Sequence, residues 1–402
     1  MRRTLPAAGL GAALRPHLLD ATMFWSSAGV GGVRRVIETK RSALRQRGWR
    51  HTLMAPGVRG PGRVDCGGWP VPASGGYRFV VQRQRAAALI ERCQPDLIEA
   101  ADPFVLASAV ADAANALQVP AIAFCHSDLT HWARGLLGGQ GRVADWGERQ
   151  ARRHLARLYA DFDLVLAPSR AMTARLADLG VRHAMHQPLG VDCRIFRPEA
   201  REPAWRRALL ARLGLAPHTR LVAYAGRFSA EKHLDLLAAA VDRLGPGHVL
   251  VAMGAGPRPP RPGRAVRLLP PGPAAEVARL LASADVFAHA GDQETFGLAA
   301  LEAMACGRPL VVRHREGLAE LADGVGTRVD SDRAEDWAEA LRAALAAADD
   351  RPCEAALARA RAHDWPHVID HLAGHYLRLL GAGHAPDGGG PAAWAPGALG
   401  HA

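Results

Sequence analysis

The chain has 402 residues, of which 49% are hydrophobic, and this is enough to fill two sizeable cores. No run approaches the roughly 18 apolar residues of a membrane-spanning helix, and the six cysteines show neither a CxxC spacing nor a disulfide-like framework, which favours the reducing cytoplasm over a secreted scaffold. The formal net charge is +11, but no zinc-finger, RNA-recognition or basic-zipper pattern accompanies it, so no nucleic-acid partner is expected.

The first half of the chain alternates strand-like and helix-like segments. Residues 1–16 mimic a signal peptide, but their short apolar part is interrupted by Pro6 and Gly9, so a loose N-terminal extension is expected. Apolar runs at 17–25, 51–56, 95–100, 120–126 and 163–169 predict strands, and helices are predicted for Val33–Gln46, Tyr77–Arg92 and Pro103–Leu117.

Positive charge is concentrated in this half. Residues 1–200 hold 27 Arg or Lys against 16 Asp or Glu, whereas residues 201–402 hold 23 of each. A field of this sign attracts anionic partners, so an anionic membrane surface is one expected partner, and a merely arginine-rich, soluble surface is the alternative. The densest cluster lies on and after the first helix: Arg34, Arg35, Lys40, Arg41, Arg45, Arg47 and Arg50.

The alternation restarts after Pro198–Pro203. Strands are predicted at 221–226, 248–254, 265–270, 285–290 and 309–312. Alternating strands and helices indicate parallel sheets covered on both faces, here as two Rossmann-like α/β domains at 1–198 and 199–364. Residues 365–380 predict a last helix, and the tail 381–402, rich in Gly, Pro and Ala, is expected to be disordered.

Two carboxylates, Glu294 and Glu302, bracket seven residues near the start of an apolar helix that opens near Gly297. If the whole offset were helical, about 12 Å along the axis would separate them, which suits a ligand as long as a nucleotide-sugar. Between them, the backbone N–H groups of Phe296, Gly297 and Leu298 would lie at a helix N-terminus, where an anion is favoured.

A second segment predicts the same ligand. Residues 221–237 run from an apolar strand through Arg227 into a helix that carries Lys232, one of only two lysines in the chain. The planar guanidinium and the compact ammonium would grip adjacent phosphates in different ways. Ordinary solvated charges at a helix start are the alternative interpretation.

These segments carry a resemblance to a known family. AGRFSAEK followed by GDQETFGLAALEAMACGRPLV resembles the donor-binding half of the retaining glycosyltransferases of family 4, which have the GT-B fold, and the similarity leans toward the GDP-mannose-dependent mannosyltransferases. SSAGVGGVRR, FCHSD, DLVLAPSRAM and LGVDCRIFRP resemble further segments of that family in the expected order. The resemblance implies two Rossmann-like domains facing a cleft, an acceptor-binding N-terminal domain, a C-terminal donor-binding domain, and a last helix that crosses back onto the first domain.

The resemblance also implies roles for individual residues. The catalytic set would be His126, Glu294, Arg227 and Lys232, with Glu294 binding sugar hydroxyls and Glu302 accepting from the ribose. The donor would further contact Gly31, Gly32, Gly254, Thr295, Phe296, Gly297, Leu298 and Glu302. Position 255 is alanine where the family usually has an acidic residue, so the base that is read stays open.

No metal and no other cofactor are expected. Asp161-Phe162-Asp163 matches the DxD pattern of metal-dependent glycosyltransferases, but Asp163 begins an apolar strand, at the wrong end for ligand binding. Arg227, Lys232 and the helix N-terminus would instead neutralise the leaving diphosphate.

The predicted activity is metal-independent transfer of a hexose, with mannose favoured, from a nucleoside-diphosphate sugar to a lipid or glycan hydroxyl with retention of configuration. Two alternatives stay open: an epimerase or phosphorylase of the same fold, and a non-catalytic protein that binds nucleotide-sugars or anionic lipids. The expected location is the cytoplasm, with attachment to the inner face of the cytoplasmic membrane left open.

Overall fold

The computed structural model describes residues 15–25, 31–71, 76–137, 140–348 and 351–381. Within these ranges, residues up to 188 and from 366 onward form one compact unit, and residues 189–365 form a second. The expected domain boundary at 198/199 thus lies ten residues after the division at 188/189. The expectations for the N-terminal extension and the C-terminal tail fall, but for residues 15, 16 and 381, outside the described residues.

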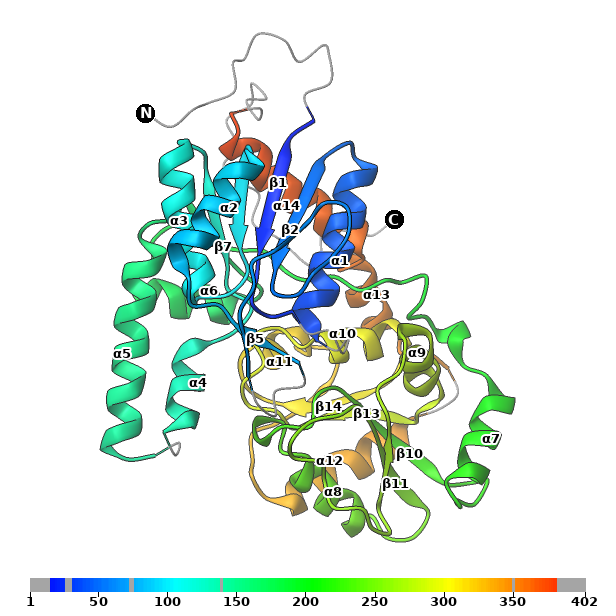
Figure 1. Cartoon of the computed structure of the whole chain (residues 1–402). Coiled ribbons are helices and arrows are strands. Elements are labelled where there is room, and N and C mark those ends of the chain that lie inside the picture. Colours follow the sequence, from blue (N-terminus) through cyan, green and yellow to red (C-terminus); the bar gives the residue numbers. More distant parts are fainter. Residues whose placement is uncertain (1–14, 26–30, 72–75, 138–139, 349–350, 382–402) are drawn as a thin grey trace. The chain divides into compact units, whose positions relative to one another are not determined.

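The first unit is built on a parallel sheet of seven strands in the order β3-β2-β1-β6-β7-β8-β9 (Figure 1). The chain winds outward from β1 in one direction and then returns to the other side of β1, so a switch point lies between β1 and β6. The strands are β1 (His17–Ala21), β2 (Arg50–Ala55), β3 (Arg63–Asp65), β6 (Leu97–Ala100), β7 (Ala121–Phe124), β8 (Leu164–Ala167) and β9 (Ala184–His186).

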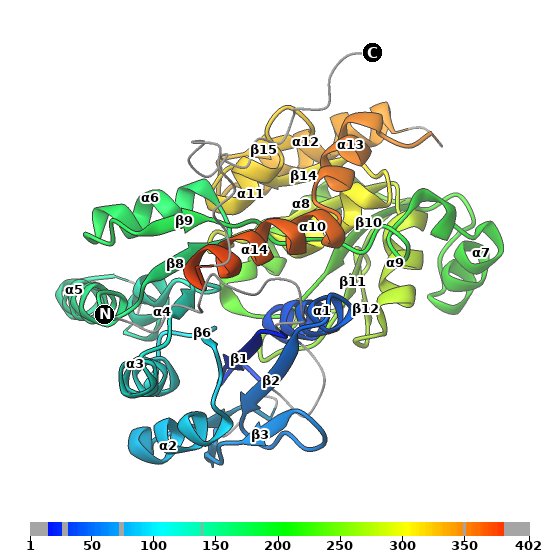
Figure 2. The same cartoon turned by 90° about the horizontal axis from the view of Figure 1, so that it is seen from above.

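Helices cover both faces of this sheet, and strand alternation decides what each face meets. Leu19 and Ile98 pack into the apolar core with α2 and α3, whereas Asp20 and Glu99 point to the side of α1 and α14 (Figure 2). The helices of this unit are α1 (Gly32–Gln46), α2 (Arg83–Cys93), α3 (Val105–Leu117), α4 (Leu129–Leu136), α5 (Arg142–Tyr159), α6 (Arg170–Asp178) and α14 (Trp365–Leu379).

One helix prediction is wrong at its start. The segment predicted as a helix from Tyr77 begins instead with β5 (Arg78–Phe79), which pairs antiparallel with β4 (Trp69–Pro70), and α2 starts only at Arg83. The pairing partner, β4, lies outside the segment with the helical pattern, so that pattern gave no sign of the strand.

The basic cluster on the first helix is partly consumed inside the unit. Lys40 is fully buried on α1, where its Nζ donates to Asp20 at 2.6 Å and Glu99 at 2.5 Å. Arg41 is buried and donates to the carbonyl of Pro61. Arg47 pairs with Asp370, and Arg34 lies over the Trp25 ring. Much of this charge therefore serves the fold instead of facing a partner.

The second unit repeats the architecture with six parallel strands in the order β12-β11-β10-β13-β14-β15. This order is that of the dinucleotide-binding Rossmann fold, and its switch point lies between β10 and β13. The strands are β10 (Arg220–Ala225), β11 (His248–Met253), β12 (Val266–Leu269), β13 (Val286–His289), β14 (Leu310–Arg313) and β15 (Thr327–Val329).

Both faces of the second sheet are apolar, because helices bury each of them. Val222 and Leu250 pack with Leu237 of α8 and Trp337 of α12, while α9 and α10 contact the sheet through β10 and β13. The helices are η1 (Pro198–Ala200), α7 (Pro203–Arg212), η2 (Ala230–Lys232), α8 (Leu234–Arg243), α9 (Ala274–Ser283), α10 (Leu298–Ala305), α11 (Glu316–Leu321), α12 (Ala334–Ala347) and α13 (Glu354–Ala362). Among the described helices, none has the length and apolar character needed to cross a membrane.

Candidate active site

The predicted donor-site residues of the second unit gather at the carboxyl ends of β10 and β13, on either side of the switch point. Arg227 and Lys232 follow β10, and Glu294 follows β13. In a doubly wound parallel sheet, ligands bind in the crevice outside this point. Two segments 62 residues apart in sequence are therefore neighbours at the position where the fold class binds its ligands.

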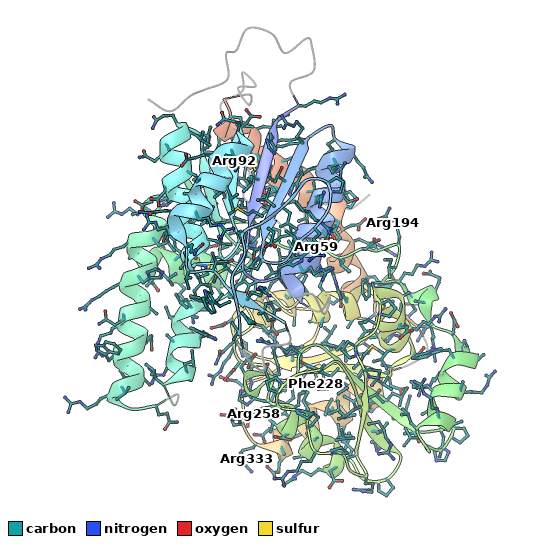
Figure 3. The ribbon with its side chains drawn as sticks, viewed as in Figure 1. Arg59, Arg92, Arg194, Phe228, Arg258 and Arg333 are labelled. Atoms are coloured by element: carbon teal, nitrogen blue, oxygen red, sulfur yellow. The ribbon has the colours of Figure 1, made fainter. Side chains whose placement is uncertain are left out.

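The loop after β11 lies directly against the loop after β10. The N–H of Phe228 donates to the carbonyl of Ala255, and the N–H of Arg258 donates back to the carbonyl of Phe228. Figure 3 labels Phe228 and Arg258 in the second unit. Gly254 has a φ of 157°, and a Cβ there would lie 1.8 Å from the carbonyl oxygen of Gly226. Gly254, predicted to bind the donor, thus has a definite structural function, which is to let two site loops meet backbone to backbone.

Glu294 is the centre of the polar network. Its Oε1 accepts from Lys232 Nζ at 2.5 Å and lies 3.1 Å from His289 Nε2. Both contacts fall on the same oxygen, and among the described residues none contacts Oε2. The carboxylate is therefore held from one side, and its second oxygen can accept a further hydrogen bond.

His289 is the residue that sequence reasoning missed here. It is the last residue of β13, it is buried, and its Nδ1 accepts the N–H of Gly291 at 3.1 Å. A neutral imidazole with Nδ1 as acceptor carries its proton on Nε2, so His289 donates to Glu294. Its only signal in the sequence was a histidine at the end of an apolar strand, a position that usually indicates a structural role.

The network fixes the charge of Glu294. Burial opposes ionisation, but the ammonium of Lys232 and the N–H of His289 outweigh it and hold the pKa of Glu294 well below its ordinary value. Glu294 is thus a carboxylate throughout the physiological pH range. It can accept hydrogen bonds from sugar hydroxyls, but it cannot supply a proton.

Arg227 lies at the outer side of the same network. It is 61% exposed and donates to Glu231, which also accepts from the Ser229 hydroxyl and lies 4.0 Å from Lys232. The hydroxyl of the buried Tyr224 donates to the backbone carbonyl of Arg227 and thereby anchors the loop. Both predicted phosphate-binding cations are paired with carboxylates, Arg227 with Glu231 and Lys232 with Glu294.

Helix α10 begins at Leu298, after Gly297 in a left-handed conformation with a φ of 103°. The predicted helix start near Gly297 is confirmed. Glu302 lies about one turn into α10 and is 6% exposed, whereas Phe296 is buried with its ring 6.0 Å from His363. Any contact of Phe296 with a donor would therefore come from its backbone. Thr295 and Leu298 are partly exposed beside it.

The remaining predicted site residues belong to the first unit. Gly31 caps α1 with a φ of 146° after β1, and Gly32 is the first residue of that helix. His126 follows β7, and its ring stacks on Phe124 at 4.1 Å. Burial and the nearby Lys40 lower the pKa of His126 to about 3, so its imidazole is neutral.

Aromatic side chains line the carboxyl edge of the same sheet. Phe104, which follows β6, makes edge contacts with Phe24 after β1 at 5.8 Å, with Phe79 of β5 at 6.3 Å and with Trp132 of α4 at 6.0 Å. Phe79 and Trp132 are 41% and 56% exposed. This aromatic edge is a second feature that sequence reasoning missed.

The DxD pattern has a structural explanation. Phe162 is buried in the core, and Asp163, at the amino end of β8, accepts the N–H of Ala121 at 2.8 Å. Both aspartates lie at the end of the strand opposite to the carboxyl edge, as the sequence predicted.

Comparisons with known proteins agree with this geometry. Residues 30–195 match the model of Glycosyltransferase Family 4, and residues 219–347 match that of Glycosyl transferases group 1. A GDP-mannose-dependent alpha-(1-6)-phosphatidylinositol dimannoside mannosyltransferase of Mycobacterium tuberculosis is 30% identical over 373 residues, which are 88% of this chain and 93% of that protein. The chain belongs to glycosyltransferase family 4.

Two further proteins bear on this family 4 glycosyltransferase. A GDP-mannose-dependent alpha-mannosyltransferase of Mycolicibacterium smegmatis is 31% identical over 313 residues, 75% of this chain and 78% of that protein. The crystal structure of Anabaena HepE in complex with UDP and glucose has a TM-score of 0.69 at 19% identity and covers 89% of this chain and 98% of that one. The predicted GT-B fold is thereby confirmed, and the enzyme is a glycosyltransferase that uses nucleotide-sugar donors.

Proposed function

We propose that this glycosyltransferase moves mannose from GDP-mannose to a hydroxyl of a lipid-linked acceptor, with retention of configuration and without a metal ion. The relatives that are 30% and 31% identical are named as GDP-mannose-dependent mannosyltransferases, and one is named for a phosphatidylinositol mannoside acceptor. The main alternative is the same transfer reaction with UDP-glucose as the donor.

The observation that carries the proposal is the setting of Glu294. It lies at the switch point of the donor-side sheet, permanently ionised, with one oxygen held by Lys232 and His289 and the other without a partner among the described residues. A fixed acceptor of this kind suits the hydroxyls of a transferred sugar, because hydrogen bonds to a charged group are the strong ones.

Two cations and a helix N-terminus supply the charge that the leaving diphosphate needs. Lys232 lies 2.5 Å from Glu294, so an ammonium that contacts the sugar-binding carboxylate is also positioned beside the phosphate attached to that sugar. Arg227 is exposed and can turn from Glu231 to a phosphate oxygen. Together with the first N–H groups of α10 they would stabilise the negative charge that develops on departure, which is the task a metal ion performs elsewhere.

The sugar would become oxocarbenium-like as the diphosphate leaves. The two carboxylates of this network, Glu294 and Glu231, are each held by a cation, Lys232 and Arg227, so the proposal includes no covalent glycosyl-enzyme step. In the proposed step the acceptor hydroxyl attacks from the face that the diphosphate leaves, and the departing phosphate oxygen takes the hydroxyl proton. His126 is neutral and would serve as a hydrogen-bonding group instead of a charge.

The aromatic edge of the first unit supports a lipid-linked acceptor. Exposed Phe79 and Trp132 flank Phe104 at the carboxyl ends of the strands, where an open parallel sheet binds its ligand. Exposed aromatic surface of this kind gains free energy when an aliphatic chain or a sugar ring covers it.

A panel of donors tests the proposal directly. GDP-mannose, UDP-glucose and ADP-glucose would be compared by thermal shift and by transfer of labelled sugar to extracted membrane lipids, each with and without EDTA. We expect GDP-mannose at about 100 times its Kd to stabilise the second unit by about 2.7 kcal/mol, with or without EDTA. If UDP-glucose alone stabilised the protein, the proposed donor would be wrong and UDP-glucose would take its place. Transfer that EDTA abolishes would refute the metal-free mechanism.

Substitution of the two central residues tests the mechanism. Lys232→Ala and Glu294→Ala should each lower kcat/KM by at least about 100-fold, because each removes a charge that acts in the transition state. The matched control is Arg264→Ala, which breaks the exposed pair with Asp242 in the same unit and should change kcat/KM less than about twofold. Transfer at the wild-type rate by either central variant would remove the mechanism's basis.

A further inference from the structure

Helix α5 has an unusual outer face. At about 100° per residue, Arg142, Trp146, Arg149, Arg153 and Arg157 fall on one stripe, with Val143 at its margin. The opposite side of the helix is buried and carries Ala144, Ala151, Leu155 and Leu158. We call the outer residues 142, 143, 146, 149, 153 and 157 the α5 stripe.

The arginines of the α5 stripe have no side-chain partner among the residues that the structure describes. In the described part of the chain, none of these four arginines makes an ion pair or a hydrogen bond through its side chain, and all four are exposed. The only acids of α5, Asp145 and Glu148, lie off the stripe, and both accept from Arg134 of α4 at 2.8 Å. All charged residues of the stripe are therefore cationic, and the stripe extends about 22 Å along the helix.

Large apolar side chains sit within this charge. Val143 is 63% exposed and Trp146 is 55% exposed. Tryptophan is enriched where one end of a side chain meets lipid and the other meets water, and arginine can extend its charged end to a phosphate while its stem covers apolar surface. Helix α5 lies at an edge of the first unit in both views (Figures 1 and 2), and every residue of the α5 stripe is exposed.

We infer that the α5 stripe docks on the surface of an anionic lipid bilayer, with Trp146 and Val143 at the headgroup boundary and the four arginines on lipid phosphates. The charge complementarity is direct, since each arginine near an anionic membrane contributes about 1 kcal/mol. A face with cationic residues around tryptophan and an aliphatic side chain is the pattern of a helix that lies in the interface plane.

This surface differs from the one that the sequence suggested. The densest basic cluster lies on α1, but there Lys40 and Arg41 are buried and Arg47 is paired with Asp370. On α5 the arginines of the stripe are spaced along one exposed side, and none of them pairs with a residue that the structure describes. In the described structure α5 thus presents four exposed arginines without an ion pair on one side, whereas the α1 cluster keeps mainly Arg45 and Arg50 exposed in this way.

Nucleic acid is the competing partner for unpaired arginines. Its backbone would satisfy the charges, but a duplex backbone offers no apolar layer for Val143 and Trp146. The apolar members of the stripe therefore favour the bilayer, and RNA binding is kept as an outcome of the test.

The test is co-sedimentation of the full-length protein with vesicles, without any sugar donor, so its result is independent of the proposed transfer reaction. Vesicles of phosphatidylcholine with phosphatidylglycerol would be compared with pure phosphatidylcholine. The triple variant Arg149→Gln, Arg153→Gln, Arg157→Gln should bind the anionic vesicles about 100-fold more weakly, at about fivefold per arginine. The matched control removes three exposed arginines of the second unit, Arg207, Arg261 and Arg342, and should bind like the wild type.

A second variant separates the apolar contribution from the charge. Trp146→Ala should weaken binding severalfold while the wild-type salt dependence is kept, whereas the triple variant should lose most of that dependence. Thermal melting of each variant confirms that it folds. The inference would be overturned if the triple variant and its control bound the anionic vesicles equally, or if the wild type bound both vesicle types equally. It would also be overturned if the wild type bound a single-stranded RNA more tightly than the vesicles and the triple variant lost that binding.

Discussion

At the scale of single residues, the candidate active site depends on one carboxylate whose environment was invisible in the sequence. Glu294 and Lys232 were predicted from their motifs, and their contact at 2.5 Å agrees with a shared site. His289 was not predicted, because its function follows from a hydrogen bond to Gly291 that only the folded loop creates. Sequence motifs indicate which charges matter, but they do not show which neutral group orients them.

His289 is expected to act as a positioning residue. His289→Asn keeps an acceptor for Gly291 but removes the donor to Glu294, so kcat/KM should fall about tenfold or more, since a hydrogen bond to a charged group is worth about 1.5–3 kcal/mol. The pKa of Glu294 should rise, which moves the acidic limb of the pH–rate profile to higher pH. His289→Gln, whose amide can donate to Glu294, should restore part of the activity; an unchanged profile for the Asn variant would exclude the positioning role.

Gly254 offers a second prediction at this scale. Gly254→Ala places a Cβ 1.8 Å from the carbonyl of Gly226, so the two site loops must separate, and we expect a loss of about 3 kcal/mol in unfolding free energy together with weaker donor binding. Gly263→Ala is the control, because nothing lies within 4 Å of its Cβ, and it should change stability by less than about 0.5 kcal/mol. Urea unfolding and donor titration measure both effects, and equal behaviour of the two variants would be contrary to this account.

At the scale of elements, the strands were the most predictable part. Each of the ten predicted strand runs contains a strand, because buried parallel strands are continuous apolar segments. The short strands β3, β4, β5, β9 and β15 have only two or three residues each and carry too little pattern to be recognised. Lys40 was interpreted as surface charge because its partners, 20 and 59 residues away, are brought to it only by the order of the strands.

Helices α1 and α14 are linked in two ways that should differ in strength. In the buried link, Tyr376 of α14 donates to Glu99 at 2.6 Å, and Glu99 also accepts from Lys40 of α1. In the exposed link, Arg47 pairs with Asp370. Removing the partner of a buried polar group lowers the free energy of unfolding more than removing the partner of an exposed one, because water cannot take the place of the buried partner.

Urea unfolding of three variants measures this difference. Lys40→Met should destabilise the first unit by about 3–5 kcal/mol, since it leaves two buried carboxylates without their cation. Tyr376→Phe should lower the free energy of unfolding by about 1–3 kcal/mol. Arg47→Ala should cost less than about 1 kcal/mol. A cost for Arg47→Ala equal to that of Lys40→Met would show that the buried triad is not the main link.

At the scale of the whole molecule, buried histidines make stability sensitive to acid. Burial, with help from His371 and Arg378, lowers the pKa of His375 to about 3, and burial lowers that of His363 to about 4. The unfolded chain takes up a proton at each below about pH 6.5, but the folded chain does not. Stability is therefore fully present above that pH and is lost as the pH falls toward the folded pKa values.

For each histidine, the free energy of unfolding is expected to fall by about 1.4 kcal/mol per pH unit. His363 acts on the second unit and His375 on the first. His375→Phe should reduce, by this amount, the slope of the first unit's unfolding free energy against pH between about pH 6.5 and pH 4. Urea midpoints measured over that range give the slope, and the exposed His218→Gln variant should leave it unchanged. A slope that His375→Phe does not alter would mean that other groups govern the acid response.

The order in which the chain is synthesised meets a constraint in the discontinuous first unit. Its sheet is complete by residue 188, yet Glu99 and Trp49 receive Tyr376 only after the whole second unit has been made. The N-terminal half therefore emerges from the ribosome before Tyr376 is available to Glu99, whereas the second unit is one continuous segment, residues 189–365. Chains that stop before Tyr376 would lack this partner of Glu99, and we expect them to engage chaperones.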